Sequence, residues 1–259
     1  MRTITATRYV TPLREGGSLP AIVEADDSGL YVVKFRGAGH GKKALIAELV
    51  TGELARAAGL RVPEIVRIEV DPALGRNEPD QEIRDLLRAS AGTNIGLDYL
   101  PGSITFDPIA GPPPSAAEAS TIVWFDAFAT NVDRTARNPN LLCWHRNLWL
   151  IDHGAALYFH HAWDDPAASG RSPFAAVKDH VLLRWATQLA AAGERLAARL
   201  GRTDVDRVLA EVPDSWLDDE PRFATPAAHR AAYADYFERR RAAAPMFLEE
   251  ALRVHHALV

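Results

Sequence analysis

The chain has 259 residues, which is enough for one large domain or for two small lobes that share a cleft. Hydrophobic residues make up 47% and charged residues 24% of the sequence, and these ordinary values exclude collagen-like repeats and long disorder. The formal net charge of -5 lacks the basic excess that nucleic acid or an anionic membrane surface attracts, so neither is expected as a direct partner.

The cysteine content and the first residues favour a reducing compartment. Cys143 is the single cysteine, which excludes an intramolecular disulfide and a cysteine-based zinc cage. Residues 1–8 lack the apolar stretch of a secretion signal, and no apolar run approaches the about 20 residues of a membrane helix. We therefore expect a cytoplasmic protein.

The first third of the chain alternates strand-like runs with turn residues. β-branched and aromatic residues predict an antiparallel start of three strands, over 8–13, 21–25 and 30–35. Apolar residues at helical spacing then predict an amphipathic helix over 43–60. The elements expected after it are a strand over 62–70, a short helix over 79–90 and an extended connection over 95–106.

A capping signal and a hairpin organise the middle of the chain. Ser115 and Glu118 have the spacing of a capping box, which predicts a helix that ends near Asn131. Apolar runs at 141–144 and 148–151 flank a short polar turn and predict a hairpin. This arrangement places one polar loop before the hairpin and another directly after it.

The remainder of the chain is predicted to be helical. Helices follow from Phe174 onward, and the last begins at Thr225-Pro226 with a kink at Pro245. The basic run Arg239–Arg241 is interpreted as a solvated helix face. A boundary near residue 98 would divide the chain into an N-terminal lobe, 1–97, and a C-terminal lobe, 98–259.

A turn and a strand of the first lobe have the properties of a phosphate site. A turn containing Gly16, Gly17 and Ser18 lets backbone N–H groups approach phosphate oxygens without an intervening side chain. Lys34 ends an apolar strand, Val-Val-Lys-Phe, which is similar to the strand on which kinases carry a phosphate-binding lysine. A solvated edge-strand lysine is the alternative interpretation.

Glu48 is the predicted partner of that lysine. It shares one helical stripe with Leu45, Leu49 and Gly52, and the glycine leaves room for close packing against the sheet. Glu53 is the competing candidate on the same helix.

The segment Asn131-Val-Asp-Arg has the pattern of a phosphotransfer loop. Such a loop needs a carboxylate that accepts the proton of an attacking hydroxyl, and Asp133 fits this role. An amide that binds metal should follow it. The spacing from the aspartate selects Asn138, whereas the position directly before the strand favours Asn140, and both stay open.

Asp152 follows the hairpin and precedes His153-Gly154, nineteen residues after Asp133. This is the position at which kinases place the aspartate that binds a magnesium ion bridging the phosphates. Because both aspartate motifs occur in the right order and strand context, the sequence predicts a magnesium site between them.

Taken together, these motifs resemble those of the HipA-like kinases, over roughly residues 8–157. The resemblance implies an α+β, bilobal protein kinase-like fold, with a small antiparallel β N-lobe carrying one helix and a larger, mainly helical C-lobe. It implies ATP and Mg2+ as cofactors. Lys34 would contact the ATP phosphates and Glu48 would orient it, Asp133 would be the base, and Asp152 with Asn140 or Asn138 would hold the metal. Adenine would lie near the backbone of Asp98, Tyr99 and Leu100.

The expected activity is transfer of the γ-phosphate to a hydroxyl, with a protein Ser or Thr as the favoured acceptor. The longer HipA-type proteins act with a DNA-binding antitoxin, so an antitoxin-like partner is among the predictions. One alternative is a small-molecule kinase of the aminoglycoside or choline type, with a cation pocket formed by Asp164, Asp165 and Asp179. Another is a nucleotide-binding pseudokinase or scaffold without turnover.

Overall fold

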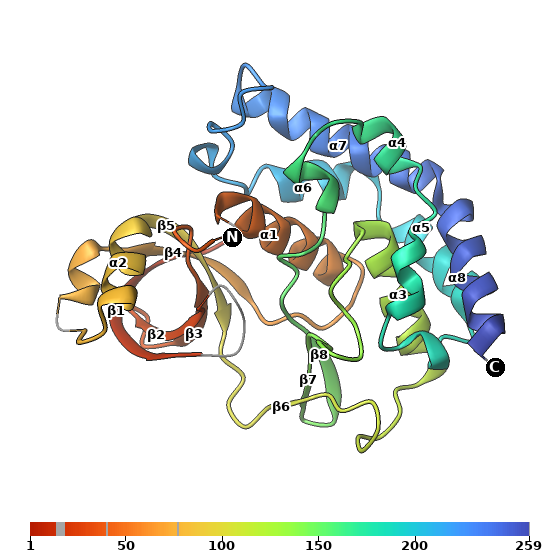
Figure 1. Ribbon diagram of the computed structural model, residues 1–259, viewed down its shortest axis with the longest axis horizontal. Coiled ribbons are helices and arrows are strands. Elements are labelled where there is room, and N and C mark those ends of the chain that lie inside the picture. Colours follow the sequence, from red (N-terminus) through yellow and green to blue (C-terminus); the bar gives the residue numbers. More distant parts are fainter. Residues whose placement is uncertain (14–18, 40, 77, 259) are drawn as a thin grey trace.

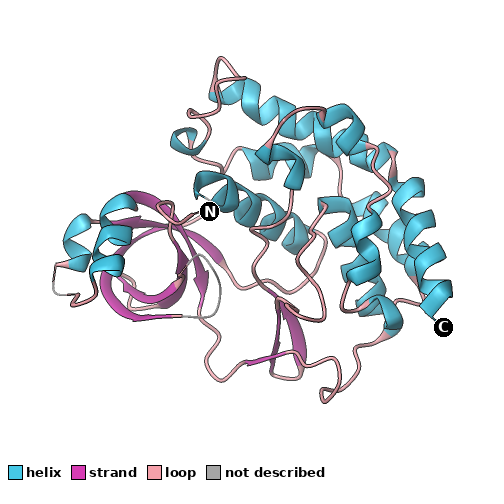
Figure 2. Cartoon of the chain, in the orientation of Figure 1, coloured by secondary structure: helices cyan, strands magenta, loops and turns pink. Residues whose placement is uncertain are grey.

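The structure is a computed structural model that describes residues 1–13, 19–39, 41–76 and 78–258. It consists of a β-barrel followed by a larger helical part, with a short three-stranded sheet between them (Figures 1 and 2). The α+β, bilobal kinase-like fold expected from the sequence is confirmed. The lobe boundary near residue 98 stays a prediction.

The barrel is built from β1 (Thr3–Pro12), β2 (Ala21–Ala25), β3 (Leu30–Lys34), β4 (Ile65–Val70) and β5 (Gly92–Asp98) in the order β1-β2-β3-β5-β4. Alternate residues of β2 and β3 are buried, as expected of strands with one face on a core. Antiparallel pairing accounts for all neighbours except β1 and β4, which pair in parallel and close the barrel.

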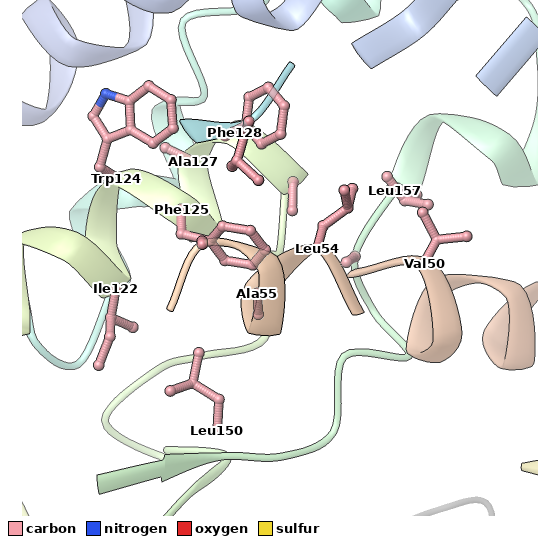
Figure 3. Close-up of a cluster of buried hydrophobic side chains, with 14 of the residues drawn as sticks. Val50, Leu54, Ala55, Ile122, Trp124, Phe125, Ala127, Phe128, Leu150 and Leu157 are labelled. Carbon is pink, nitrogen blue, oxygen red and sulfur yellow. The ribbon is translucent and has the colours of Figure 1, made fainter. Parts of the chain in front are cut away.

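Two helices accompany the barrel, rather than the one of the expected N-lobe. The short helix α2 (Gln81–Ala89) packs Ile83 and Leu87 into the barrel core, after a 3-10 turn at Pro72–Gly75. The longer helix α1 (Gly41–Ala57) instead buries its apolar side chains in the larger core of the helical part. Figure 3 shows Leu54 and Ala55 of α1 in one cluster with Phe125 and Phe128 of the next long helix. That core also includes Ile65 of β4 and Ile95 and Leu97 of β5, so α1 packs against both parts of the molecule.

The helical part begins with the predicted capped helix and hairpin. Helix α3 (Ala116–Ala129) starts where the Ser115 hydroxyl accepts the Glu118 amide, and it ends at Thr130 in left-handed conformation. The hairpin strands β7 (Leu141–Trp144) and β8 (Asn147–Leu150) pair with each other, and β6 (Ile104–Thr105) adds to β7. The polar loops before β7 and after β8 consequently lie at the same end of the hairpin.

Five further helices complete the helical part among the described residues. They are α4 (Pro166–Gly170), α5 (Leu189–Arg199), α6 (Arg202–Leu209), α7 (Pro226–Ala242) and α8 (Ala244–Leu258), with 3-10 turns at Tyr158–His161, Ala175–Asp179, Leu183–Trp185 and Asp214–Trp216. Where the sequence predicts a kink at Pro245, the structure ends α7 and begins α8. In the described part of the chain, every helix is too short or too polar to cross a membrane.

Arg240 corrects the interpretation of the basic run as a solvated face. Its side chain is fully buried, and its guanidinium donates hydrogen bonds to the carbonyls of Ala127 and Phe128 at the C-terminus of α3. The last carbonyls of a helix lack partners within the helix, and a cation satisfies them well. Arg240 therefore caps α3 from α7, a role that sequence position alone did not indicate.

Candidate active site

The predicted lysine and glutamate form an ion pair between the two parts of the molecule. Lys34 ends β3, and its Nζ lies 2.6 Å from Oε2 of Glu48 on α1. The Glu48 side chain is completely buried, whereas the competing Glu53 pairs with Arg56 on its own helix. A buried glutamate without a partner would be costly, so this pair fixes the lysine relative to α1.

Charge and hydrogen bonding keep both members of the pair ionised. Burial alone would raise the pKa of Glu48, but the Lys34 charge and hydrogen bonds from His153 outweigh it and hold that pKa at about 2. Burial opposes the charge of Lys34 as well, yet Glu48 and Asp152 raise the pKa of Lys34 above its ordinary value.

Asp152 completes the cluster from the loop after β8. Its Oδ1 lies 2.5 Å from Lys34 Nζ, and its side chain is 47% exposed. The next residue, His153, donates its backbone N–H to Glu48 at 2.7 Å, which ties this loop to α1. Asp152 itself adopts a left-handed backbone, with φ 53°. The Asp152 carboxylate thus faces solvent, while the hydrogen bond from His153 to Glu48 holds its loop against α1.

Gly52 explains why β4 can approach α1 so closely. A Cβ placed on Gly52 would lie 2.4 Å from Cδ1 of Ile65 in β4 and 3.6 Å from Nδ1 of His153. Real Cβ atoms do not approach other atoms as closely as the first distance, so the contact with β4 requires a glycine or a shift of Ile65.

The Asp133 loop supplies the second carboxylate and the two candidate amides. Asn138 donates its Nδ2 to Asp133 Oδ2 at 2.7 Å, and Asn140 donates its Nδ2 to the backbone carbonyl and Oδ2 of Asp133, both at 3.3 Å. Both amides therefore keep an oxygen for another partner. Asn140 is nearly buried and its carbonyl accepts the N–H of Ile151, the residue before Asp152, whereas Asn138 is exposed.

Asp126, Arg134 and His180 form a buried support that the sequence analysis did not identify. Arg134 Nε lies 2.5 Å from Asp126 Oδ2, and His180 Nε2 lies 3.0 Å from the same oxygen. Burial opposes the Asp126 charge, but Arg134 and His180 hold its pKa well below the usual range. The same guanidinium donates to the backbone carbonyls of Asn140 and Ile151. One arginine thus connects α3 to both loops that carry the aspartates.

A signal for this support was present in the sequence. Asp126 is a charged residue within the otherwise apolar stretch 122–129, and a charge at such a place requires a partner. Arg134, next to the predicted base, was the nearest candidate along the chain.

Four of the groups described above line one cavity of about 270 Å3, whereas Glu48 and Asn140 are not among its described lining residues. Lys34, Asp133, Asn138 and Asp152 all face it, and its apolar wall includes Leu45 of α1. Carboxylate and amide oxygens are ligands that suit Mg2+, which also retains water and phosphate oxygens. Among the described residues, groups of three or more His, Cys, Asp or Glu that could hold a metal are absent. The donors present therefore fit a magnesium ion shared with a phosphate ligand rather than a closed protein cage.

Of the two sets of predicted nucleotide-binding residues, one is not described by the structure and the other lies outside this cavity. Gly16, Gly17 and Ser18 fall outside the described residues. Asp98 ends β5, followed by the half-buried Tyr99 and the buried Leu100, and these three residues connect the barrel to the helical part. They do not line the cavity of the aspartates in the described part of the chain.

Comparison with known proteins assigns the chain to a family. A family model described as HipA-like kinase matches residues 7–242. The chain belongs to the HipA-like kinase family. Its family and its fold identify it as a phosphotransferase. No curated protein matches the sequence.

Solved structures resemble this HipA-like kinase in fold. The crystal structure of a Helicobacter pylori proinflammatory kinase, CtkA, matches with a TM-score of 0.58 and 12% identity, over 97% of this chain and 98% of that one. A Golgi casein kinase with Mn and ADP bound matches with a TM-score of 0.51 and 12% identity, over 100% of this chain and 76% of that one. Both neighbours are kinases, as the resemblance predicted from the sequence.

Proposed function

We propose that this HipA-like kinase transfers the γ-phosphate of ATP, with Mg2+, to the hydroxyl of a protein Ser or Thr. The observation that carries the proposal is the convergence of Lys34, Asp133 and Asp152 on one cavity. These are a cation for phosphate oxygens, a base for a hydroxyl and a metal carboxylate, which is the set that phosphoryl transfer requires. A module that only binds nucleotide has no need of the base, which argues against a pseudokinase or scaffold.

In this proposal each residue has one task. Lys34 contacts the phosphates and Glu48 holds it in place. Asp133 accepts the proton of the acceptor hydroxyl, and Asp152 holds Mg2+, which when bound neutralises charge on the phosphates. The ion pair between Lys34 and Asp152 supports this assignment, since a bound phosphate and metal would replace two charges that now satisfy each other.

Asn140 is the proposed metal amide and Asn138 the group that orients Asp133. The backbone bond from Ile151 to Asn140 brings this amide beside the Asp152 loop. The shorter contact, 2.7 Å, joins Asn138 to the carboxylate of the proposed base.

We also propose that ATP is held by the turn of Gly16, Gly17 and Ser18 and by the connection at Asp98, Tyr99 and Leu100. The backbone N–H groups of Asp98 and Tyr99 already donate hydrogen bonds to the carbonyls of Glu64 and Leu30. The N–H group that donates to adenine is therefore assigned to Leu100. An antitoxin-like partner stays a prediction.

The small-molecule alternative lacks support from its proposed cation pocket. Asp164 pairs with Arg222 at 3.5 Å, and Asp165 accepts the Ala168 amide as the cap of α4. Asp179 is exposed. Within the described part of the chain, none of the three aspartates lines the cavity that contains Asp133.

Nucleotide binding and transfer test the proposal separately. A ligand at 100 times its Kd stabilises a protein by about 2.7 kcal/mol, so Mg-ATP should raise the melting temperature by about 5–10 °C. Asp152→Asn should remove most of this shift. Asp133→Ala should keep it while slowing transfer of labelled phosphate to lysate proteins about 10²–10⁴-fold. Equal transfer by Asp133→Ala and the parent chain would reject the proposed base.

A further inference from the structure

A second cavity adjoins the active site on the helical side. Its volume is about 260 Å3, and it shares two wall residues, Val132 and Tyr158, with the cavity that contains the aspartates. Val132 directly precedes the proposed base, Asp133. Both wall residues are prominent at the surface, with Val132 38% and Tyr158 64% exposed. A ligand that reaches Asp133 can therefore extend over this wall into the second cavity.

Packed aromatic side chains form part of the wall of the second cavity. Phe159 stacks on Tyr236, with ring centroids 3.7 Å apart and an interplanar angle of 16°. The Tyr236 hydroxyl in turn lies 3.0 Å from the hydroxyl of Thr130, at the end of α3. Side chains that are packed and hydrogen-bonded in this way hold a shape before any ligand arrives, which lowers the entropic cost of binding.

The chemistry of the lining selects an uncharged group. Among the described residues that line the second cavity, none carries a charged side chain, although charged residues are 24% of the sequence. Hydroxyl groups belong to Thr130, Ser169, Ser172 and the two tyrosines, and the other lining side chains are aromatic or aliphatic. Transferring a charge into such surroundings is unfavourable, so cationic acceptors of the aminoglycoside type are disfavoured.

The size of the cavity fits one side chain. A closed apolar cavity of about 150 Å3 already accepts benzene, whereas pockets for whole drug-sized ligands occupy about 300–1,000 Å3. We propose that the acceptor is a peptide segment whose Ser or Thr hydroxyl lies at Asp133 while a neighbouring apolar side chain fills this second cavity. The inference rests on the proposed kinase function and specifies its substrate class.

A peptide library tests the inference. Peptides with a central Ser or Thr, each with one flanking position set to Leu, Phe, Asp or Lys, are incubated with the native chain and labelled Mg-ATP. We expect about tenfold faster phosphorylation with Leu or Phe than with Asp or Lys at one flanking position, the size of effect that an apolar pocket provides.

Charge substitutions at the rim then assign that preference to the cavity. Ala175 lines it and is exposed, so Ala175→Asp should fold normally and shift the preferred flanking residue from Leu to Lys. Ser169→Lys should shift it from Leu to Asp and serves as the second variant should Ala175→Asp lower the melting temperature. Ala191→Asp, on the exposed face of α5, is the matched control and should leave the preference unchanged.

The outcomes separate this inference from the proposed function. Phosphorylation without a flanking preference, or with a preference that both rim variants retain, would overturn the role of the cavity and leave the kinase function standing. Absence of phosphorylation on every peptide, with intact Mg-dependent ATP binding, would overturn the peptide acceptor. Loss of ATP binding as well would reject the proposed function itself.

Discussion

Two buried ion pairs form in and around this site, and the sequence motifs predict only one of them. Lys34 and Glu48 belong to a motif that can be recognised in the sequence. Arg134 and Asp126 also form a cation–carboxylate pair and are buried more completely, but they hold the two aspartate loops in place without lining the cavity. Replacing one member of a buried pair leaves an uncompensated charge, which makes both pairs sensitive to substitution.

Arg134→Met should destabilise the protein strongly. It would leave the Asp126 carboxylate buried with hydrogen bonds to His180 and Asn131 but without its arginine partner, at a cost of about 3–5 kcal/mol and a fall in melting temperature of roughly 10 °C. Arg137→Met changes an exposed arginine of the same loop and should shift the melting temperature by less than about 2 °C. Equal melting temperatures for the two variants would show that the Arg134 pair does not stabilise the fold.

The two asparagines should respond differently to magnesium. Asn140→Ala removes the proposed metal ligand, so about tenfold more Mg2+ should be needed for half-maximal transfer, since groups around a metal typically contribute 10–100-fold. Asn138→Ala should slow transfer at saturating Mg2+ because Asp133 loses a hydrogen bond. Magnesium titrations of the transfer rate distinguish the two effects, and the reverse pattern would exchange the assignments.

At the scale of elements, α1 connects the site to the rest of the molecule. It presents Glu48 to Lys34 on the barrel while Leu54 and Ala55 pack in the helical core (Figure 3). The position of the lysine partner therefore depends on how closely α1 approaches β4, and Gly52 sets that distance.

A paired substitution tests the role of Gly52. Gly52→Ala should cost about 1–3 kcal/mol, because the added methyl would overlap Ile65 Cδ1. Ile65→Val removes that atom. In the Ile65→Val variant, the same Gly52→Ala change should be neutral or stabilising, since alanine favours a helix by about 1 kcal/mol over glycine. Urea unfolding of the four chains measures this coupling, and additive effects would reject the proposed contact.

At the scale of the whole molecule, acid should unfold the protein through its buried groups. The folded pKa of Glu48 is about 2, against an ordinary value of 4.5, and Asp126 is lowered as well. Carboxylates of this kind stabilise the fold above pH 4.5 and lose that contribution as the pH falls towards 2. His160, buried with its pKa well below 6.5, adds a decline that begins below pH 6.5 because only the unfolded chain takes up the proton readily.

Unfolding free energies between pH 8 and 3 check this expectation. The parent chain should lose stability below pH 6.5 and more steeply below pH 4.5. Glu48→Gln should be less stable at pH 7 and should show a smaller loss between pH 4.5 and 3, because its side chain no longer titrates. Parallel curves for the two chains would show that folding does not lower the pKa of Glu48.

Local patterns in the sequence were sufficient for much of the fold and for the family. Strand composition, the Ser115 cap and the aspartate motifs depend on neighbouring residues, so the helices, the hairpin and the HipA-like kinase motifs could be read directly. The parallel pairing of β1 with β4 could not be predicted in this way, because it joins segments about 60 residues apart and leaves no local pattern in the sequence.

The sequence by itself determined which residue types were available for phosphate, metal and proton transfer. Tertiary structure alone decided their partners: it paired Lys34 with Glu48 rather than Glu53, buried Arg134 and Arg240, and placed an uncharged cavity beside Asp133. The physical reason is that burial and charge pairing depend on which elements meet in space. A single long-range contact can change a solvated side chain into a structural one at the same position in the sequence.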